Sequence, residues 1–510
     1  MGRPATHVVV RLCALLLALV FVSAAPTAAS AQGKIAGRVT EAGTNQPLAG
    51  VNVFIEGTQQ GTTTDADGNY VVVNVRPGEY VLVFSFIGFR TQRMTDVRVV
   101  TGQTTRIDMQ MREEIIEGEE IVVQAQRPLV QKDLTASRKT VVAEDIDALP
   151  VESLFDVLQT QAGVTTGADG SIHIRGGRSN EVSYLVDGLS VGNPFETNGL
   201  ATSVATDAIQ EMTVISGAFN AEYGKAMSGI VNLVTKEGGD SYRGSFSAYG
   251  GDNVTRHGDV FFSPDGVTLN SYTLEGSLAG PVPLLNGVSF FVSGRHDRDD
   301  GHIFGRRQHL PSDSANFNSN PIYYEIHGRP WTDYLDGEAV PDDLVAMNPR
   351  QSANVLGKLT ARPFSRLKIE YSYLYDQGKR TPFSFGYRFN PDGVASIRDH
   401  SNNHSLHLTH TVSDRMFYTV RSSYAWSEYS HFLYEDPADP RYVSTGRIVG
   451  FPGLNFLMGG TQNFHLYESS RSVRARFDLT RQMGIIHEAK VGIDMQLHWL
   501  DRQNFTILYD

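Results

Sequence analysis

A serine inside a glycine-rich pattern is the first feature of this 510-residue chain that suggests chemistry. Gly188-Leu189-Ser190-Val191-Gly192 has the spacing of a hydrolase nucleophile elbow, in which a strand, a tight turn and a helix present the serine. Asn193-Pro194 follows at once and opposes that helix, because the residue before a proline avoids helical backbone. We therefore expect a turn at this position and assign no catalytic residue.

Metal-binding patterns are also weak. Asp65, Asp67 and Asn69 begin like a calcium loop, but an EF-hand needs glycine at its position 6 and glutamate at its position 12. Here Gly68 is the fourth residue of the loop and Arg76 the twelfth, so a plain turn is expected. The 15 histidines show no ligand spacing and no HExxH occurs. We expect no metal site and no cofactor.

Composition narrows the class of protein. Hydrophobic residues make up 41% of the chain and charged residues 20%, and the net charge of -12 argues against a nucleic-acid partner. Arg3 and Arg11 precede a short apolar run, and Ala29-Ser30-Ala31 offers a cleavage site, which together predict a signal peptide at residues 1–31. The single cysteine, Cys13, lies within it, so the mature chain is expected to have no disulfide.

Residues 32–112 alternate short apolar strands with turns, which predicts a small antiparallel β-sandwich. The expected strands are Lys34 to Thr40, Val51 to Glu56, Tyr70 to Val75, Tyr80 to Phe86 and Thr105 to Met111. The stretch from Gly37 to Phe89 resembles the carboxypeptidase-regulatory-like domain. In that family the domain is a non-catalytic module, so the resemblance implies no peptidase activity.

Residues 113–127 form a charged linker around one β-prone island, Ile121, Val122, Val123, Gln124 and Ala125. Such an island is suited to pairing with the exposed strand edge of another protein. The alternative is that it forms a last strand of the sandwich. The island resembles the energy-coupling segment called the TonB box, which favours the first interpretation.

Residues 128–236 change to a mixed pattern, with strands expected at Thr140 to Ala143 and Glu211 to Ile215 and a helix at Ile146 to Gln161. Two short apolar alternations, Ile172 to Ile174 and Tyr184 to Val186, flank a glycine-arginine corner and close on a turn. The motif residues are Arg175, Gly176, Gly177, Arg178, Asp187, Gly188, Glu222, Tyr223 and Gly224. The segment is similar to the plug domain of TonB-dependent outer-membrane receptors. That resemblance implies that Arg175 is a latch that faces carboxylates of a barrel wall, whereas Ser216-Gly217 leaves a second plug arginine unassigned.

Residues 237–510 read as long alternating segments joined by links that are short and long in turn, which is typical of outer-membrane barrels. The expected strands are Tyr242 to Gly250, Thr268 to Ala279, Val288 to Asp297, Ser352 to Ala361, Leu367 to Asp376, His404 to Thr411, Met416 to Glu428, Ser470 to Leu479 and His487 to Arg502. Plugged transporters use about 22 strands, so about nine predict the N-terminal part of a longer barrel. One long polar link carries aromatic candidates for ligand binding, Phe304, Tyr323, Tyr324, Trp331 and Tyr334.

The expected fold is therefore mainly β: a small N-terminal β-sandwich, a mixed α/β plug and the first strands of a transmembrane antiparallel β-barrel. The resemblance implies an outer-membrane receptor, with a periplasmic sandwich and plug, that imports a scarce extracellular ligand. Its partners would be TonB with the inner-membrane motor complex, outer-membrane lipids, a surface lipoprotein, and an iron chelate, vitamin, glycan or peptide as ligand. The alternative is a surface adhesion or assembly protein that uses the barrel as an anchor.

Overall fold

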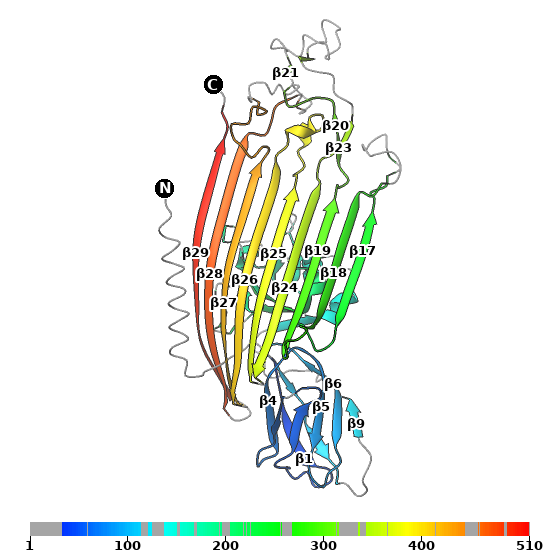
Figure 1. The fold of residues 1–510 in the computed structure, drawn as a ribbon, viewed down its shortest axis with the longest axis vertical. Helices are drawn as coiled ribbons and strands as arrows, with labels where there is room; N and C mark the ends of the chain where they lie inside the picture. The colour runs from blue at the N-terminus through cyan, green and yellow to red at the C-terminus, as the bar shows by residue number, and fades with distance from the viewer. Residues whose placement is uncertain are drawn as a thin grey trace.

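The computed structural model divides the chain into a sandwich, a plug and a curved wall of strands (Figure 1). It describes residues 33–508 except 59, 114–120, 125–136, 150–152, 168–170, 193, 196–203, 218, 221, 225, 256, 258–267, 313, 316–334, 337–342, 365, 414, 444–456, 458 and 484–486. The expected signal peptide, residues 1–31, lies outside this part. Within the described part, no helix is long and apolar enough to cross a membrane.

The wall is one antiparallel sheet in the order β17-β18-β19-β24-β25-β26-β27-β28-β29. Its strands are β17 Arg243–Gly251, β18 Ser271–Pro281, β19 Val288–Asp299, β24 Arg350–Phe364, β25 Leu367–Arg380, β26 Ser396–Ser413, β27 Met416–Phe432, β28 Phe464–Met483 and β29 His487–Thr506. All nine predicted wall strands are confirmed. Several run further than expected, because ladder pairing with a neighbour holds polar ends such as residues 396–403, whose sequence pattern is weak.

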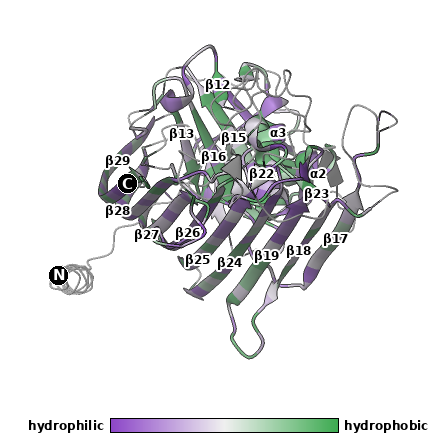
Figure 2. Cartoon of the chain, turned by 90° about the horizontal axis from the view of Figure 1, so that it is seen from above, coloured by the Kyte–Doolittle hydropathy of each residue, from purple (hydrophilic) through white to green (hydrophobic). Residues whose placement is uncertain are grey.

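The two faces of the wall differ as the alternating sequence requires. On β24, Lys358 points inward and is 3% exposed, whereas its outward neighbour Leu359 is 49% exposed. Seen from above, the strands carry alternating hydrophilic and hydrophobic bands and curve around the plug (Figure 2). Residues of opposite character therefore separate onto a plug-facing side and an outer side.

The plug is a five-stranded sheet in the order β10-β15-β16-β13-β14, with a separate β11-β12 hairpin. Its elements are β10 Ser137–Val142, α2 Ala143–Asp147, α3 Leu154–Gln159, β11 Val164–Thr166, β12 Ile172–Ile174, η1 Ser179–Glu181, β13 Val182–Val186, β14 Leu189–Ser190, η2 Thr206–Ala208, β15 Ile209–Ser216 and β16 Gly229–Thr235. The strands predicted around Thr140 and Glu211 are confirmed. The single helix predicted from Ile146 to Gln161 is wrong, because two short helices occupy this stretch. Ser153 starts the second of them with a capping box to Asp156.

The sandwich has two sheets, β4-β1-β7 with β8 also paired to β1, and β3-β2-β5-β6-β9. Its strands are β1 Gly33–Glu41, β2 Asn52–Ile55, β3 Gly61–Thr63, β4 Asn69–Val75, β5 Gly78–Ser85, β6 Gln92–Val99, β7 Thr104–Arg106, β8 Met109–Met111 and β9 Ile121–Gln124. Sequence reasoning missed β3 and β6 and merged β7 with β8. Tyr70 and Phe84 meet edge to face in the apolar core between the sheets.

The sandwich docks at the end of the wall where β26 turns into β27 (Figure 1). Phe417 packs against Ala36, Val71 and Val73 of the sandwich. The Asn74 side-chain amide donates to Thr411 Oγ1 at 2.8 Å. The opposite end of the wall carries the small pairs β20–β23 and β21–β22, with bounds β20 Phe304–Arg307, β21 Ser314–Ala315, β22 Leu335–Asp336, β23 Asp343–Ala346, η4 Phe385–Tyr387 and η5 Pro391–Gly393.

Candidate functional site: the plug–wall interface

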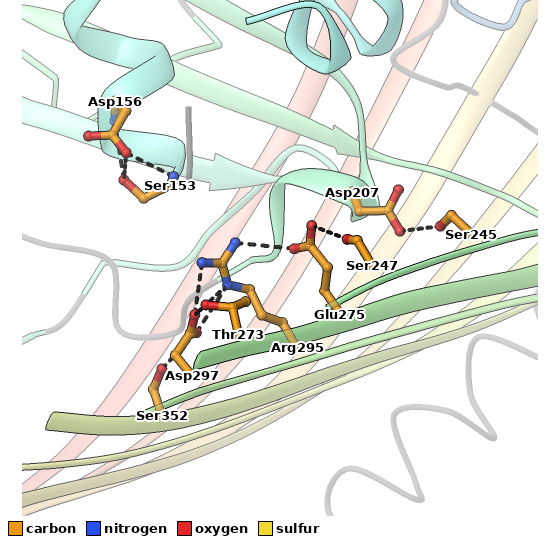
Figure 3. Close-up of polar contacts among 10 residues, drawn as sticks. All are labelled: Ser153, Asp156, Asp207, Ser245, Ser247, Thr273, Glu275, Arg295, Asp297 and Ser352. Carbon is orange, nitrogen blue, oxygen red and sulfur yellow. Dashed lines mark hydrogen bonds and ion pairs between the residues drawn. The ribbon is translucent and has the colours of Figure 1, made fainter. Parts of the chain in front are cut away.

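Charged side chains line the plug-facing side of the wall. Arg295 on β19 donates to Asp297 at 3.0 Å and to Glu275 on β18 at 3.2 Å (Figure 3). Asp297 also accepts from Thr273 at 2.9 Å and from Ser352 at 3.1 Å. This inner surface is thus a connected polar network, which water can solvate wherever the plug does not cover it.

The plug contacts the same inner face of the wall through Asp207, whose carboxylate accepts from Ser245 of β17 at 2.9 Å (Figure 3). Further along the wall, three more carboxylates meet basic side chains of the strands: those of Asp187 and Glu222 in the plug, and that of Glu237 just after the plug's last strand. We call these the three seat carboxylates.

Asp187 reaches the wall because it lies in a tight hairpin turn. Strands β13 and β14 pair Val186 with Leu189, so Asp187 and Gly188 form the two-residue loop. Both residues have positive φ, 48° and 78°, as a type I′ turn requires. The turn projects the Asp187 carboxylate onto Lys358, whose Nζ lies 3.0 Å away. Thr235 of β16 completes the site by donating from its backbone N–H at 2.9 Å and its hydroxyl at 2.8 Å.

The Asp187 carboxylate is held in its charged form. Burial alone would raise the pKa of Asp187, but the positive charge of Lys358, with the hydrogen bonds from Thr235, holds that pKa below its ordinary value. An ionised pair with satisfied oxygens is the form in which a buried carboxylate is tolerated.

Glu237 links the three parts of the chain. Its carboxylate lies 2.6 Å from Lys368 Nζ of β25 and 2.9 Å from Arg76 of the sandwich. Arg362 approaches to 3.6 Å, and Lys368 also contacts Glu370 at 2.9 Å. Movement of the plug end near Glu237 would therefore disturb both the wall and the sandwich.

Glu222 contacts β28 and β29, the strands at the opposite end of the wall sheet from β17. It accepts from Arg476 of β28 at 3.0 Å and also pairs with Lys490 of β29. Arg476 in turn contacts Asp478 at 2.8 Å, and Arg421 contacts the same Asp478 at 3.3 Å. Burial alone would raise the pKa of Glu222, whereas Lys490 and Arg476 lower it, and the net direction is down.

An apolar patch accompanies these charges. Phe291, Leu356 and Leu374 of the wall belong to the same buried cluster as plug residues such as Val231 and Leu233. The plug is therefore held by a limited apolar contact and by ion pairs that fix its position.

Four of the predicted motif residues lie in this interface or beside it. Asp187 and Glu222 are seat carboxylates, and Gly188 lies against the Arg421 guanidinium, so a methyl group added there would come within 3.1 Å of it. Tyr223 packs on Leu185 and Ile230 in a second plug cluster.

The glycine-arginine corner lies elsewhere. Arg175 is exposed, has φ of 51°, and donates from its backbone N–H to Gly163 O at 2.7 Å. Within the described residues it has no ion pair, so its predicted contact with wall carboxylates stays a prediction. The pairs that the structure does contain have the opposite polarity, with carboxylates on the plug and cations on the wall.

The neighbours of Arg175 shape the corner itself. Gly176 has φ of 74°, and Gly177 lies too close to the Ser228 side chain to carry a side chain of its own. The backbone N–H of Arg178 donates to the Glu181 carboxylate at 3.2 Å. Gly224 has open space around it. These residues therefore build the local turn.

The wall cations were missed by sequence reasoning. Lys358, Lys368, Arg421 and Arg476 all occupy inward positions of strands whose outward neighbours are mostly apolar. The alternation of inward and outward positions along each strand could be predicted from the sequence. It did not indicate which plug carboxylate each inward cation would contact.

The remaining chemical motifs have structural roles. The turn itself is at Asp187 and Gly188, and Leu189 and Ser190 form the two-residue strand β14, so of the turn predicted from Gly188 to Gly192 only the first residue lies in it. The Asp65 carboxylate accepts from the backbone N–H groups of Asp67 at 3.1 Å and Asn69 at 2.9 Å, which closes the turn.

The β-prone island has a defined place. Residues Ile121 to Gln124 form β9, which pairs in parallel with β6 at the edge of a sandwich sheet. In this arrangement the island is a last sandwich strand, the alternative weighed from the sequence, and one of its backbone edges has no partner among the described strands. Ala125 lies outside the described residues.

Of the aromatic ligand candidates, Phe304 begins β20 and pairs with Ala346 of β23 at the end of the wall away from the sandwich. Tyr323, Tyr324, Trp331 and Tyr334 lie outside the part of the chain that the structure describes.

Comparison with known proteins agrees with this architecture. The model of the CarboxypepD_reg-like domain matches residues 35–123, and that of the TonB-dependent Receptor Plug Domain matches residues 130–231. The chain is 29% identical over 238 residues to the TonB-dependent transporter Oar of Myxococcus xanthus, covering 44% of this chain and 22% of that protein. It is 34% identical over 218 residues to the TonB-dependent receptor P26 of Formosa agariphila, covering 40% of this chain and 21% of that protein.

A solved structure of Pseudomonas aeruginosa FpvA bound to a heterologous pyoverdine covers 74% of this chain and 44% of its own, with 12% identity and a TM-score of 0.49. The matched part thus spans about a fifth of the length of the two curated relatives. The consecutive matches show that this chain has a CarboxypepD_reg-like domain followed by a TonB-dependent receptor plug domain.

Proposed function

We propose that this chain acts in an outer-membrane receptor that binds a scarce extracellular ligand and imports it into the periplasm by energised movement of the plug. The ligand class is an iron chelate, a vitamin, a glycan or a peptide. Relatives of the chain include vitamin B12 transporters and a ferric enterobactin receptor. No covalent chemistry is part of this proposal, and the chain is not an enzyme.

The polar plug–wall interface carries the proposal. Ion pairs such as Asp187–Lys358 and Glu222–Arg476 position the plug without a large net gain in stability, because desolvation offsets most of the attraction. When the plug leaves its seat, water can solvate the exposed charges on both sides. An all-apolar interface of the same size would resist each opening by about 25 cal/mol per Å² exposed.

The pulling handle is the island from Ile121 to Ala125, which precedes the plug. We propose that it pairs with an edge strand of TonB, and that the inner-membrane motor complex pulls on the plug through it. Support comes from its β-strand conformation and its free sheet edge. Transfer to TonB either uses that free edge or replaces the pairing with β6.

The proposal assigns a residue range to each part of the chain. Residues 32–112 form the periplasmic sandwich, 113–127 the linker with the handle, 128–236 the plug and 237–510 the wall. Ligand would be bound at the end of the wall away from the sandwich, where Phe304 lies, and Tyr323, Tyr324, Trp331 and Tyr334 remain candidates by sequence. Arg175 is kept as a proposed latch residue.

The test replaces Ile121 to Ala125 by a Gly/Ser segment of equal length in the whole receptor. Cells are given labelled ferric chelates, cobalamin, oligosaccharides and peptides, and surface binding is measured separately from uptake. We expect uptake to be lost and binding to be kept. The same replacement at residues 131–135 is the matched control and should leave uptake intact. Unchanged uptake without the handle would favour the anchor function instead.

A further inference from the structure

A concavity of about 550 Å³ is lined mainly by residues at outward positions of the wall, with Tyr429 and Glu468 contributed from the inward row between them. It crosses strands β26 to β29, where the hydrogen-bonded register aligns Arg398, Ser430, Tyr467 and Gln503 in one row. Ser430 lies nine positions after the inward Arg421 on β27, and because an odd spacing reverses the face of a strand, the row faces outward. We call this concavity the outer pocket.

The height of the outer pocket relative to the membrane follows from the rows beneath it. Register places Trp426, Arg471 and Trp499 in one outward row, and lower rows carry residues such as Tyr424, Val420 and Tyr418. From Tyr418 to Trp426 the strand is roughly 26 Å long, which at a strand tilt of about 40° is roughly 20 Å across the membrane, and the next outward row brings the height to about 25 Å, that of the apolar band in outer-membrane barrels. Trp426 and Trp499 then belong to an aromatic girdle at the interface.

The outer pocket starts at the first outward row beyond that girdle, the row of Glu428, Ser469 and Asp501. It therefore lies at the level of lipid headgroups, outside the wall. The plug and the import path are on the other face, so a ligand bound here is separate from the cargo.

The chemistry of the outer pocket combines an aromatic floor with unused polar groups. The Arg398 guanidinium lies 4.5 Å from the centroid of the Phe432 ring, and Tyr467 stacks on Phe432 at 5.3 Å. One nitrogen of Arg398, Nη1, is buried and has no hydrogen-bond partner in the described part of the chain. Such an orphan donor is costly unless a ligand or water satisfies it.

Acceptors surround this donor. Glu428, Asp501 and Gln503 line the outer pocket with exposed side chains. Their carboxylates outnumber the single guanidinium, which disfavours phosphate and other anions. Hydroxyl groups, which donate to carboxylates and accept from a guanidinium, suit this set, and a sugar ring can stack on an aromatic edge.

We propose that the outer pocket binds an uncharged saccharide. Its place beside the girdle points to the sugar headgroup of a glycolipid in the outer leaflet, and a free oligosaccharide offers the same chemistry. Arg398 and Asp501 are the specificity-determining residues, with the guanidinium satisfied by a sugar oxygen and the carboxylate by a hydroxyl.

The test uses the full chain in detergent and in lipid nanodiscs, and reads the fluorescence of Trp426 and Trp499, which adjoin the outer pocket. The probes are dephosphorylated core oligosaccharide from lipopolysaccharide, maltoheptaose, nanodiscs with or without an uncharged, phosphate-free glycolipid, and nanodiscs with intact lipopolysaccharide as the phosphorylated comparison. We expect saturable fluorescence changes with at least one saccharide. Binding of the lipid-linked form alone would identify a glycolipid as the source, and binding of the free sugars would identify a soluble glycan.

Two variants make the result specific. Arg398→Gln and Asp501→Asn should each weaken binding by about tenfold, the effect of losing one charged hydrogen bond. Arg481→Gln changes an exposed arginine at the other end of β28 and should bind like the wild type. Circular dichroism establishes that each variant is folded. Absence of binding by every saccharide, binding that requires phosphate groups, or full affinity in folded Arg398→Gln would overturn the proposal.

Discussion

The carboxylate of Asp187 and the ammonium of Lys358 meet at 3.0 Å between the plug and the wall, with side-chain exposures of 12% and 3%. The contact joins a hairpin turn of the plug to the middle of a membrane-spanning strand. It shows how the plug is positioned: a short turn places one charge, and an inward lysine receives it.

Removing the charge of Asp187 should loosen the plug. Asp187→Asn leaves the Lys358 ammonium buried without a carboxylate, and breaking such a pair costs roughly 3 kcal/mol. Hydrogen exchange of the β13 and β16 amides should rise accordingly. The double variant Asp187→Asn with Lys358→Met should recover part of the protection, and a double variant no better than the single one would contradict the pairing.

The same site predicts the direction of the acid response. The folded pKa of Asp187 lies below its unfolded value of about 3.9. Its contribution to stability is therefore complete above that unfolded pKa and is lost as the pH falls through the folded pKa. Amide protection of the plug in the wild type and in Asp187→Asn should differ at pH 7 and converge in strong acid. A constant difference down to pH 2 would exclude this ionisation as the cause.

The turn that carries Asp187 should tolerate no side chain at its second position. Gly188→Ala forces alanine to φ of 78° and brings its methyl group within 3.1 Å of Arg421 Nη1. The positive φ alone should cost about 1 kcal/mol, measured by urea unfolding of the plug. Gly192→Ala is the matched control, because nothing lies within 4 Å of its added methyl group. Equal effects of the two substitutions would argue against a strained turn.

Glu211 at the sandwich–plug junction should respond to pH in the opposite direction. Burial raises its pKa, while the Thr101 backbone N–H donates to it at 3.2 Å and the Thr213 hydroxyl at 2.9 Å. Because the pKa of Glu211 is higher in the folded chain, the contribution of Glu211 to stability is complete at a pH below its unfolded pKa. That contribution is lost as the pH rises through the folded pKa. Glutamine cannot ionise, so Glu211→Gln should not lose stability as the pH rises. At pH 8 the sandwich should therefore dock on the plug at least as strongly in this variant as in the wild type. Protease sensitivity of residues 100–103 reports the docking, and a weaker junction in the glutamine variant at pH 8 would be inconsistent with the assignment.

Much of the fold was readable from the sequence because alternation and turn residues are local signals. The nine wall strands and the hairpin turn at Asp187-Gly188 are examples. Strand β6 was missed because Gln92 to Val99 mixes charged residues with few apolar ones. Its strand conformation is stabilised by backbone pairing with β5 and β9, which the local sequence does not indicate. The helix around Pro150 was overextended because the apolar period continues across the break.

The candidate site was only partly predictable. Asp187 and Glu222 stood out as motif residues, but Lys358 and Arg476 lie 171 and 254 residues away along the chain. A carboxylate and its cation at such separations meet only through the tertiary fold. The outer pocket was missed for the same reason, since register across four strands assembles it.

Import as proposed above requires the plug to move against the wall. The mature chain is expected to have no cysteine, so Asp207→Cys with Ser245→Cys can be joined by a disulfide where the native side chains lie 2.9 Å apart. Ser247→Cys with Glu275→Cys is the control, because its bond lies within the wall, where the native side chains are also 2.9 Å apart. Labelled-ligand uptake by cells should be blocked in the oxidised plug–wall tether, restored by a reductant, and unaffected in the control. Full uptake through the oxidised plug–wall tether would contradict the account.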